Sequence, residues 1–291
     1  MNTWLLRVVW VSLPVTAGDA LAGWMHPWSD ATRFVATAAL WFLWAVVLSA
    51  VLVPRPVATT LVRLGTPLAV VAVLLAAGSG DASTGSWLLA LVVTTVACAL
   101  AVRGDFARVC AQGAAYGDEE RFPLKVPPAI AFAILPVAVL VVGAGVIAGP
   151  MLLAAHQWAV GAIVLVAGWP LAFVLGRLVH QLSRRWVVLV PAGIVIADPL
   201  TLTDPVLFVR ERVQGIGPAD PGRRPPADAL DLRLGAAFGS CALLLTDEAD
   251  LMRRVRGQGV HVQAGLILVT PTASARLLER AGKRRLPVRR D

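Results

Sequence analysis

The side chains best suited to bind a ligand are cations that gather in the last third of this 291-residue chain. Residues 184–291 contain 17 Lys/Arg against 11 Asp/Glu, whereas residues 1–183 contain 9 against 7. Cations beside a membrane span favour anionic lipid headgroups, so the formal charge of +8 needs no nucleic acid as a partner. We predict membrane-surface contacts at Arg184, Arg185, Trp186, Arg210, Arg212, Lys283, Arg284 and Arg285.

No pattern of an enzyme or a bound metal accompanies these cations. Gly239-Ser240 lacks the Gly-x-Ser-x-Gly elbow of hydrolases, and neither a P-loop nor a dinucleotide fingerprint occurs. His156 and His180 would lie roughly 36 Å apart on one helix, too far to share a metal, although His26 and His156 leave a paired site open. The three cysteines have no metal or redox spacing. We therefore predict no enzyme, no catalytic residue, no cofactor and no metal.

The first 183 residues contain six apolar stretches of the length that crosses a ~30 Å hydrocarbon core as helices. The whole chain is 57% hydrophobic and 15% charged, against about 25% charged in average soluble domains. In the fifth stretch Gly145 and Gly149 form the Gly-x-x-x-Gly pattern of close helix packing. The predicted spans are 5–24, 32–53, 58–78, 86–102, 128–148 and 155–179.

The cations also predict an orientation for these spans. Ten of them fall at one set of alternate span ends, and Arg33 alone falls at the other. Cytoplasmic loops are enriched in Lys and Arg, so we predict a multi-pass protein of the cell (plasma) membrane with both termini cytoplasmic. The first stretch is alternatively a signal peptide, with Ala20-Leu-Ala22 as a cleavage site, and its removal would leave the C-terminus on the same side.

Beyond Arg185 the apolar pattern changes from a helical period to alternation. Two β-branched runs, 186–190 and 193–197, are separated by Pro191-Ala192, as in a tight hairpin. Further strands are predicted at 206–213, 230–234, 240–245, 250–255 and 260–270, followed by an amphipathic helix at 271–281. We therefore expect a transmembrane domain at 1–183, a small all-β barrel or sandwich closed by one helix at 184–282, and a basic tail at 283–291. The loop 104–128 is either an ordered connector or a segment that docks against the β domain.

The runs Arg185-Trp-Val-Val-x-Val-Pro-x-Gly-Ile-Val-Ile196 and Leu266-Ile-Leu-Val-Thr-Pro271 resemble bacterial pleckstrin-homology-like (PH-like) domains attached to multispanning membrane helices. The resemblance implies a seven-stranded barrel, closed at one end by a helix, that binds lipid, a peptide or a second copy of itself. We expect a non-enzymatic integral membrane protein whose partners are the lipid bilayer, anionic headgroups, a protein or another copy. The alternative is a transporter or channel with a regulatory β domain, because Pro136 and Pro170 interrupt the last two spans.

Overall fold

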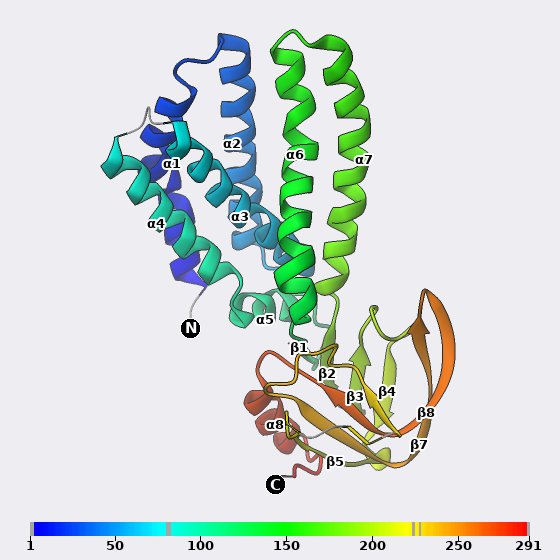
Figure 1. Cartoon of the computed structure of the whole chain (residues 1–291). Helices are drawn as coiled ribbons and strands as arrows, with labels where there is room; N and C mark the ends of the chain where they lie inside the picture. Colours follow the sequence, from blue (N-terminus) through cyan, green and yellow to red (C-terminus); the bar gives the residue numbers. More distant parts are fainter. Residues whose placement is uncertain (1–2, 80–82, 223–224, 227, 290–291) are drawn as a thin grey trace. The chain divides into compact units, whose positions relative to one another are not determined.

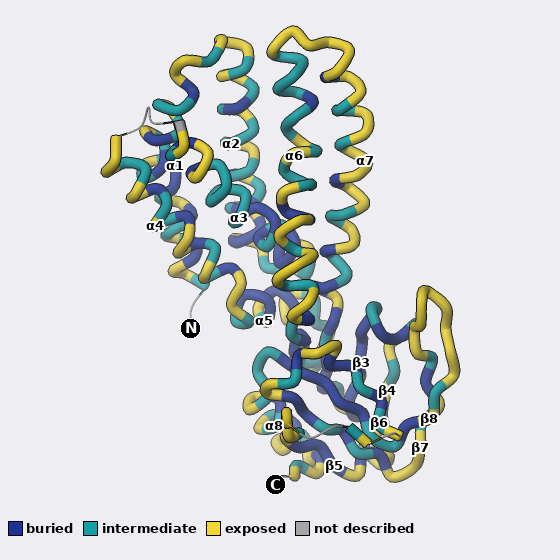
Figure 2. Tube along the Cα trace, in the orientation of Figure 1, coloured by how far each residue is buried: buried dark blue, intermediate teal, exposed yellow. Residues whose placement is uncertain are grey.

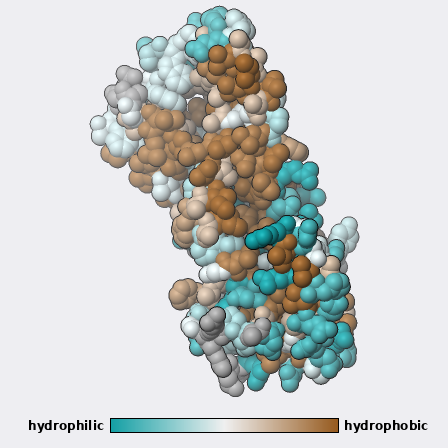
Figure 3. Space-filling model, turned by 45° about the vertical axis from the view of Figure 1, so that its right-hand side comes forward, coloured by the Kyte–Doolittle hydropathy of each residue, from teal (hydrophilic) through white to brown (hydrophobic). Residues whose placement is uncertain are grey.

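The computed structural model describes residues 3–79, 83–222, 225–226 and 228–289. The chain divides into two compact units, each shown with its elements in Figure 1. One unit contains residues 1–106 and 135–180, and the other contains residues 107–134 and 181–291. Hydrophobic residues gather on the helices of the first unit, and hydrophilic residues cover much of the second (Figure 3).

Six helices in the described chain are long and apolar enough to cross a membrane, which confirms the six predicted spans. A backbone in hydrocarbon must satisfy its own polar groups, and a helix does so within one segment. The helices are α1 (Trp4–Met25), α2 (Asp30–Leu52), α3 (Pro56–Ser79), α4 (Thr84–Ala101), α6 (Leu135–Ala154, after a π-helical turn at Ile130–Ile134) and α7 (Trp158–Leu182). A shorter helix, α5 (Gly104–Gln112), follows α4.

The fifth span extends further than predicted. It was expected to end at residue 148, but α6 continues through Pro150 to Ala154. The chain instead reverses at His156, which has a φ of 61°. A proline inside a spanning helix is tolerated when a neighbouring group satisfies the carbonyl that it frees.

The described residues of the second unit form two four-stranded sheets. The first is an antiparallel meander in the order β1-β2-β3-β4, and the second has the order β5-β7-β8-β6 with β6 parallel to β8. The strands of the first sheet are β1 (Glu120–Pro123), β2 (Trp186–Val190), β3 (Gly193–Ala197) and β4 (Val206–Val209). Those of the second are β5 (Val213–Pro218), β6 (Ala229–Asp231), β7 (Cys241–Val255) and β8 (Gln258–Val269), and α8 (Ser274–Lys283) follows.

The closed barrel expected from the resemblance is not found, because the described strands form two separate sheets. After β4 a 3-10 turn, η2 (Arg210–Arg212), takes the chain out of the first sheet and into β5. The loop 104–128 docks rather than merely connecting, since its strand β1 pairs antiparallel with β2 and places Phe122 opposite Val187. The second unit therefore includes an edge strand that precedes two of the spanning helices in the sequence.

One apolar core joins both sheets and α8 (Figure 2). Phe122 and Leu189 come from the first sheet, Ile216 and Ile267 from the second, and Leu277 from α8, each at most 2% exposed. Alternation along the strands turns one side of each sheet toward this core. Because this core holds both sheets and α8 together, it also positions the polar side chains on their outer faces.

Candidate functional site

The predicted membrane-surface residues occupy three kinds of environment. Arg184, Arg212, Lys283 and Arg285 are exposed. Trp186, Arg210 and Arg284 are partly buried, with the Arg121 guanidinium 4.8 Å from the Trp186 ring and Arg210 Nη2 donating to the Pro191 carbonyl at 2.8 Å. Arg185 is buried. The residues predicted together as membrane-surface contacts therefore differ in how far they are exposed.

Arg185 does not meet a membrane surface, because its side chain is only 1% exposed and is bound inside the second unit. Its Nε and Nη2 each donate to one oxygen of Asp198 at 2.7 Å. Its remaining donors reach the carbonyls of Lys125 at 3.0 Å and Leu232 at 3.2 Å. A buried bidentate pair with its other donors satisfied is the arrangement that a buried charge requires. Arg185 thus joins four chain segments. The prediction that it contacts lipid headgroups is corrected, because its side chain is buried in the fold.

A second pair, Arg233 with Asp231, lies beside β6 and is also bidentate, at 2.9 Å for both bonds. Burial raises the pKa of Asp231, but the hydrogen bonds and charge of Arg233 outweigh it and hold the pKa below its ordinary value. The carboxylate therefore stays ionised at neutral pH. Like Arg185, the Arg233 side chain is committed to the fold.

Three basic residues of α8 and its end are paired with acids of the second unit. Arg280 pairs with Glu120 of β1, Arg284 Nη2 lies 2.9 Å from Asp118, and Lys283 Nζ lies 2.5 Å from Glu279. Side chains held by acids have less charge to offer a lipid surface.

The basic tail, predicted at 283–291, is docked as far as it is described. Ile216 of β5 donates its N–H to the Pro287 carbonyl at 2.8 Å, and Arg289 donates its N–H to the Ile216 carbonyl at 2.8 Å. Residues 290–291 lie outside the described residues. The tail therefore extends the edge of the second sheet at β5.

A group of exposed cations that sequence reasoning missed lies at the end of the β7–β8 hairpin. Arg253, Arg254 and Arg256 are all exposed there. Arg256 and Gly257 have φ values of 49° and 86° between the paired residues Val255 and Gln258. Two successive positive φ angles form the tight I′ turn that suits the twist of a two-residue hairpin. Asn-Gly or Asp-Gly would have signalled this turn in the sequence, whereas Arg-Gly does not.

The core face of the same hairpin continues outward into an exposed edge where two valines lie beside Arg253. Leu251 is 2% exposed and lies opposite Val262, which packs against the core. Further out on the same face, Val255 is 42% and Val260 45% exposed. Residues 251–262 contain no Asp or Glu. We call Arg253, Arg254, Val255, Arg256 and Val260 the hairpin tip.

The base of the hairpin is held by the segment that follows β3. The Arg254 N–H donates to the Thr201 carbonyl at 2.7 Å, and the Thr203 N–H donates to the Met252 carbonyl at 3.1 Å. Beyond these bonds, the ends of both strands and the turn, residues 255–259, are all exposed. The fold thus presents the hairpin tip on an anchored ribbon.

The predicted packing glycines of the fifth span lie at the contact between α6 and α7. A Cβ at Gly145 would come within 2.8 Å of the Gly168 carbonyl oxygen, and one at Gly149 within 2.7 Å of the Leu165 Cα. Such approach of two backbones requires glycine.

Comparison with protein families, with curated proteins and with solved structures finds no match to this chain. Function therefore has to be inferred from the chemistry of the site, since a fold alone does not determine it. The hairpin tip combines positive charge and apolar side chains, whereas Arg185 and Arg233 form ion pairs within the second unit.

Proposed function

We propose that this chain is a non-enzymatic integral membrane protein whose C-terminal unit binds anionic lipid surfaces through the hairpin tip. One observation carries the proposal: three exposed arginines and two exposed valines lie at the end of one hairpin, within residues 251–262, which contain no Asp or Glu. Basic groups attract anionic headgroups, and apolar side chains enter the boundary between headgroups and acyl chains. The tip replaces the α8 end as the principal surface contact in this proposal.

The proposed unit is PH-like and cytoplasmic. The support for this part of the proposal is limited to a unit rich in β-strands that ends in one helix, α8. The excess of cations at one set of span ends supports the cytoplasmic placement of both termini in the cell membrane. Because the described residues include six candidate spans, the unit is attached to a membrane protein and meets lipid surfaces without a separate targeting step.

The expected strength follows from the charge of the tip. Each Arg near an anionic surface contributes about 1 kcal/mol, so three contribute ~3 kcal/mol, or roughly a hundredfold in affinity. A protein partner or a second copy of the chain is a different occupant of the same surface. Such an occupant would not require anionic lipid.

The test uses the full chain, because β1 lies far from the other strands of its sheet in the sequence. The protein is placed in neutral nanodiscs and sedimented with sucrose-loaded vesicles of phosphatidylcholine, with or without phosphatidylglycerol. We expect binding to the anionic vesicles only, and a roughly hundredfold loss in the Arg253→Gln, Arg254→Gln, Arg256→Gln triple variant.

The matched control removes the same charge from the α8 end, through Arg276→Gln, Lys283→Gln and Arg285→Gln. It should retain binding within a few-fold of the unaltered chain. Equal binding to neutral and anionic vesicles would contradict the proposal, and so would equal losses in the two triple variants. An environment-sensitive dye on Gln258→Cys reports in parallel whether the tip contacts the nanodisc that holds the protein.

A further inference from the structure

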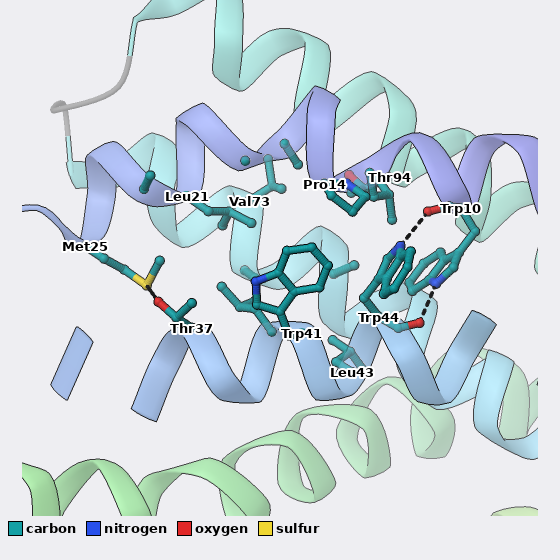
Figure 4. A pocket seen from close by; sticks show the side chains of 17 residues that line it. Trp10, Pro14, Leu21, Met25, Thr37, Trp41, Leu43, Trp44, Val73 and Thr94 are labelled. Carbon is teal, nitrogen blue, oxygen red and sulfur yellow. Dashed lines mark hydrogen bonds between the residues drawn. The ribbon is translucent and has the colours of Figure 1, made fainter. Parts of the chain in front are cut away.

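A cavity of about 260 Å³ lies among the first four spanning helices (Figure 4). Most of its wall comes from α1 between Trp10 and Met25 and from α2 between Thr37 and Trp44. Residues 10–25 cover roughly 22 Å of a helix at 1.5 Å per residue. Ala69, Ala72 and Val73 of α3 and Thr94 of α4 complete the lining. The space is therefore long and narrow.

The lining is apolar, without a charged side chain. Its Thr94 hydroxyl donates to the Ala90 carbonyl at 2.7 Å, and the Trp10 and Trp44 indole N–H groups donate to each other's backbone carbonyls at 2.9 and 3.0 Å. A cavity holds water only where polar groups provide two to four partners for it, and apolar cavities stay dry. This one therefore favours an apolar occupant over water.

Pro14 explains why one end of the cavity is closed by two tryptophans. It lies inside α1 and lacks the N–H that would bond to the Trp10 carbonyl one turn earlier. The Trp44 indole provides the missing donor, and Trp10 is 1% exposed as a result of this packing. Figure 4 shows the paired rings at one end of the space and the Trp41 indole near its middle.

The exposed residues of the cavity wall lie on α1 and α2. Among its lining residues only Ala22 of α1 and Trp41 of α2 are exposed, and all the others are buried or half-buried. Both helices are candidate membrane spans. An opening on the side of a spanning helix pair faces hydrocarbon rather than water.

We infer that the cavity is a binding site for one hydrocarbon chain of a membrane lipid, which enters between α1 and α2. An engineered protein cavity of about 150 Å³ lined by apolar side chains binds benzene, so the present volume accommodates a segment of chain. An empty space would leave its walls without dispersion contacts on one side. The site lies wholly in the first unit and is independent of the hairpin tip.

Gly18 provides a direct test, because it lines the cavity and no atom lies within 4 Å of a Cβ added there. The Cβ of Gly18→Leu would therefore meet no neighbour, and the rest of the side chain would occupy part of the cavity. Gly176→Leu on α7 is the matched control, a helical glycine with the same open surroundings that is absent from the cavity wall. The full chain, in nanodiscs containing a phospholipid with a diazirine in its acyl chain, is photolabelled and the labelled peptides are mapped.

We expect the photolabel to concentrate on residues 10–25 and 37–44. Gly18→Leu should reduce this labelling roughly tenfold or more, since steric changes in apolar pockets alter binding by at least this factor. Gly176→Leu should leave the labelling unchanged. Competition by an unlabelled phospholipid or by a polyisoprenoid alcohol then identifies which class of chain is held. Labelling spread evenly over all six helices, or equal labelling of Gly18→Leu and the unaltered chain, would overturn the inference. If Gly18→Leu fails to fold, Ala72→Leu tests the opposite wall.

Discussion

Two helix pairs of the first unit use the same hydrogen bond but pack differently. In α1 and α2, Pro14 frees the Trp10 carbonyl, which accepts the Trp44 indole N–H at 3.0 Å. In α6 and α7, Pro150 frees the Val146 carbonyl, which accepts the Trp169 indole N–H at 3.2 Å. A tryptophan of the second helix thus compensates for a proline in the first, as the absence of water in a bilayer requires.

The difference between the pairs lies in their glycines. A Cβ at Gly168 would meet the Gly145 carbonyl oxygen at 2.5 Å, so the α6 and α7 backbones touch. A Cβ at Gly18 of α1 would meet nothing within 4 Å, because the cavity lies there. The hydrogen bond therefore joins two helices without deciding how closely they pack. Small residues facing each other produce the solid contact, and small residues facing a gap leave space for a ligand.

The largest effect is expected when the same side chain, leucine, replaces a glycine in each helix pair. Gly168→Leu should destabilise the protein by about 3 kcal/mol or more, the upper range for overpacking, because backbone is in the way. Gly18→Leu should leave stability unchanged or raise it. Circular dichroism during titration with sodium dodecyl sulfate measures both, with Gly176→Leu as the control on α7. Similar losses at Gly168 and Gly18 would contradict the distinction.

Removing the hydrogen bond from the first pair should have the next largest effect. Trp44→Phe leaves the Trp10 carbonyl without its donor in a buried position, for a loss of about 1.5 kcal/mol. Pro14→Ala restores an intrahelical N–H, so the loss caused by Trp44→Phe should be smaller in that background. A double-mutant cycle on the same unfolding titration measures the coupling. Additive losses would show that the indole does not compensate for the proline.

The corresponding bond in the second pair should contribute less. Trp169 is 53% exposed and its bond is longer, so Trp169→Phe should cost about 0.6 kcal/mol, the average for interhelical bonds in membranes. Trp158→Phe, on the same helix and 64% exposed, is the control for loss of an indole. A loss at Trp169 equal to that at Trp44 would show that burial does not set the strength of this bond.

These helix pairs also show which features of the first unit could be predicted from the sequence. Hydropathy and length sufficed for six spans, because hydrocarbon allows the backbone few alternatives to a helix. The end of α6 was misplaced because Pro150 stops a helix in water, and only the position of Trp169 shows that it is tolerated here. The cavity was not predicted, since helical period does not reveal which small residues face a neighbour.

In the second unit the sequence identified most strands but not their partners. The hairpin of β2 and β3 is local and was predicted, whereas β1 is four residues long and pairs across 62 or more intervening residues. Arg185 was assigned to the surface because a cation after a span has the same pattern whether it meets headgroups or Asp198. The segment 250–255 was correctly favoured as a strand. The sequence did not show that its arginines lie at the end of a hairpin, because that depends on the turn at Gly257.

The smallest predicted effect concerns the cavity glycine itself. Glycine costs a helix interior roughly 0.5–1 kcal/mol relative to alanine, and nothing near Gly18 would obstruct a methyl group. Gly18→Ala should therefore stabilise the protein by about 0.5 kcal/mol, whereas Gly161→Ala should destabilise it, because a Cβ there lies 2.9 Å from the Leu153 backbone nitrogen. Both are measured by the same unfolding titration. A destabilising Gly18→Ala would mean that the space beside α1 closes in the membrane, and the two helix pairs would then pack alike. A stabilising one would agree with an open space beside α1, as the geometry at Gly18 shows.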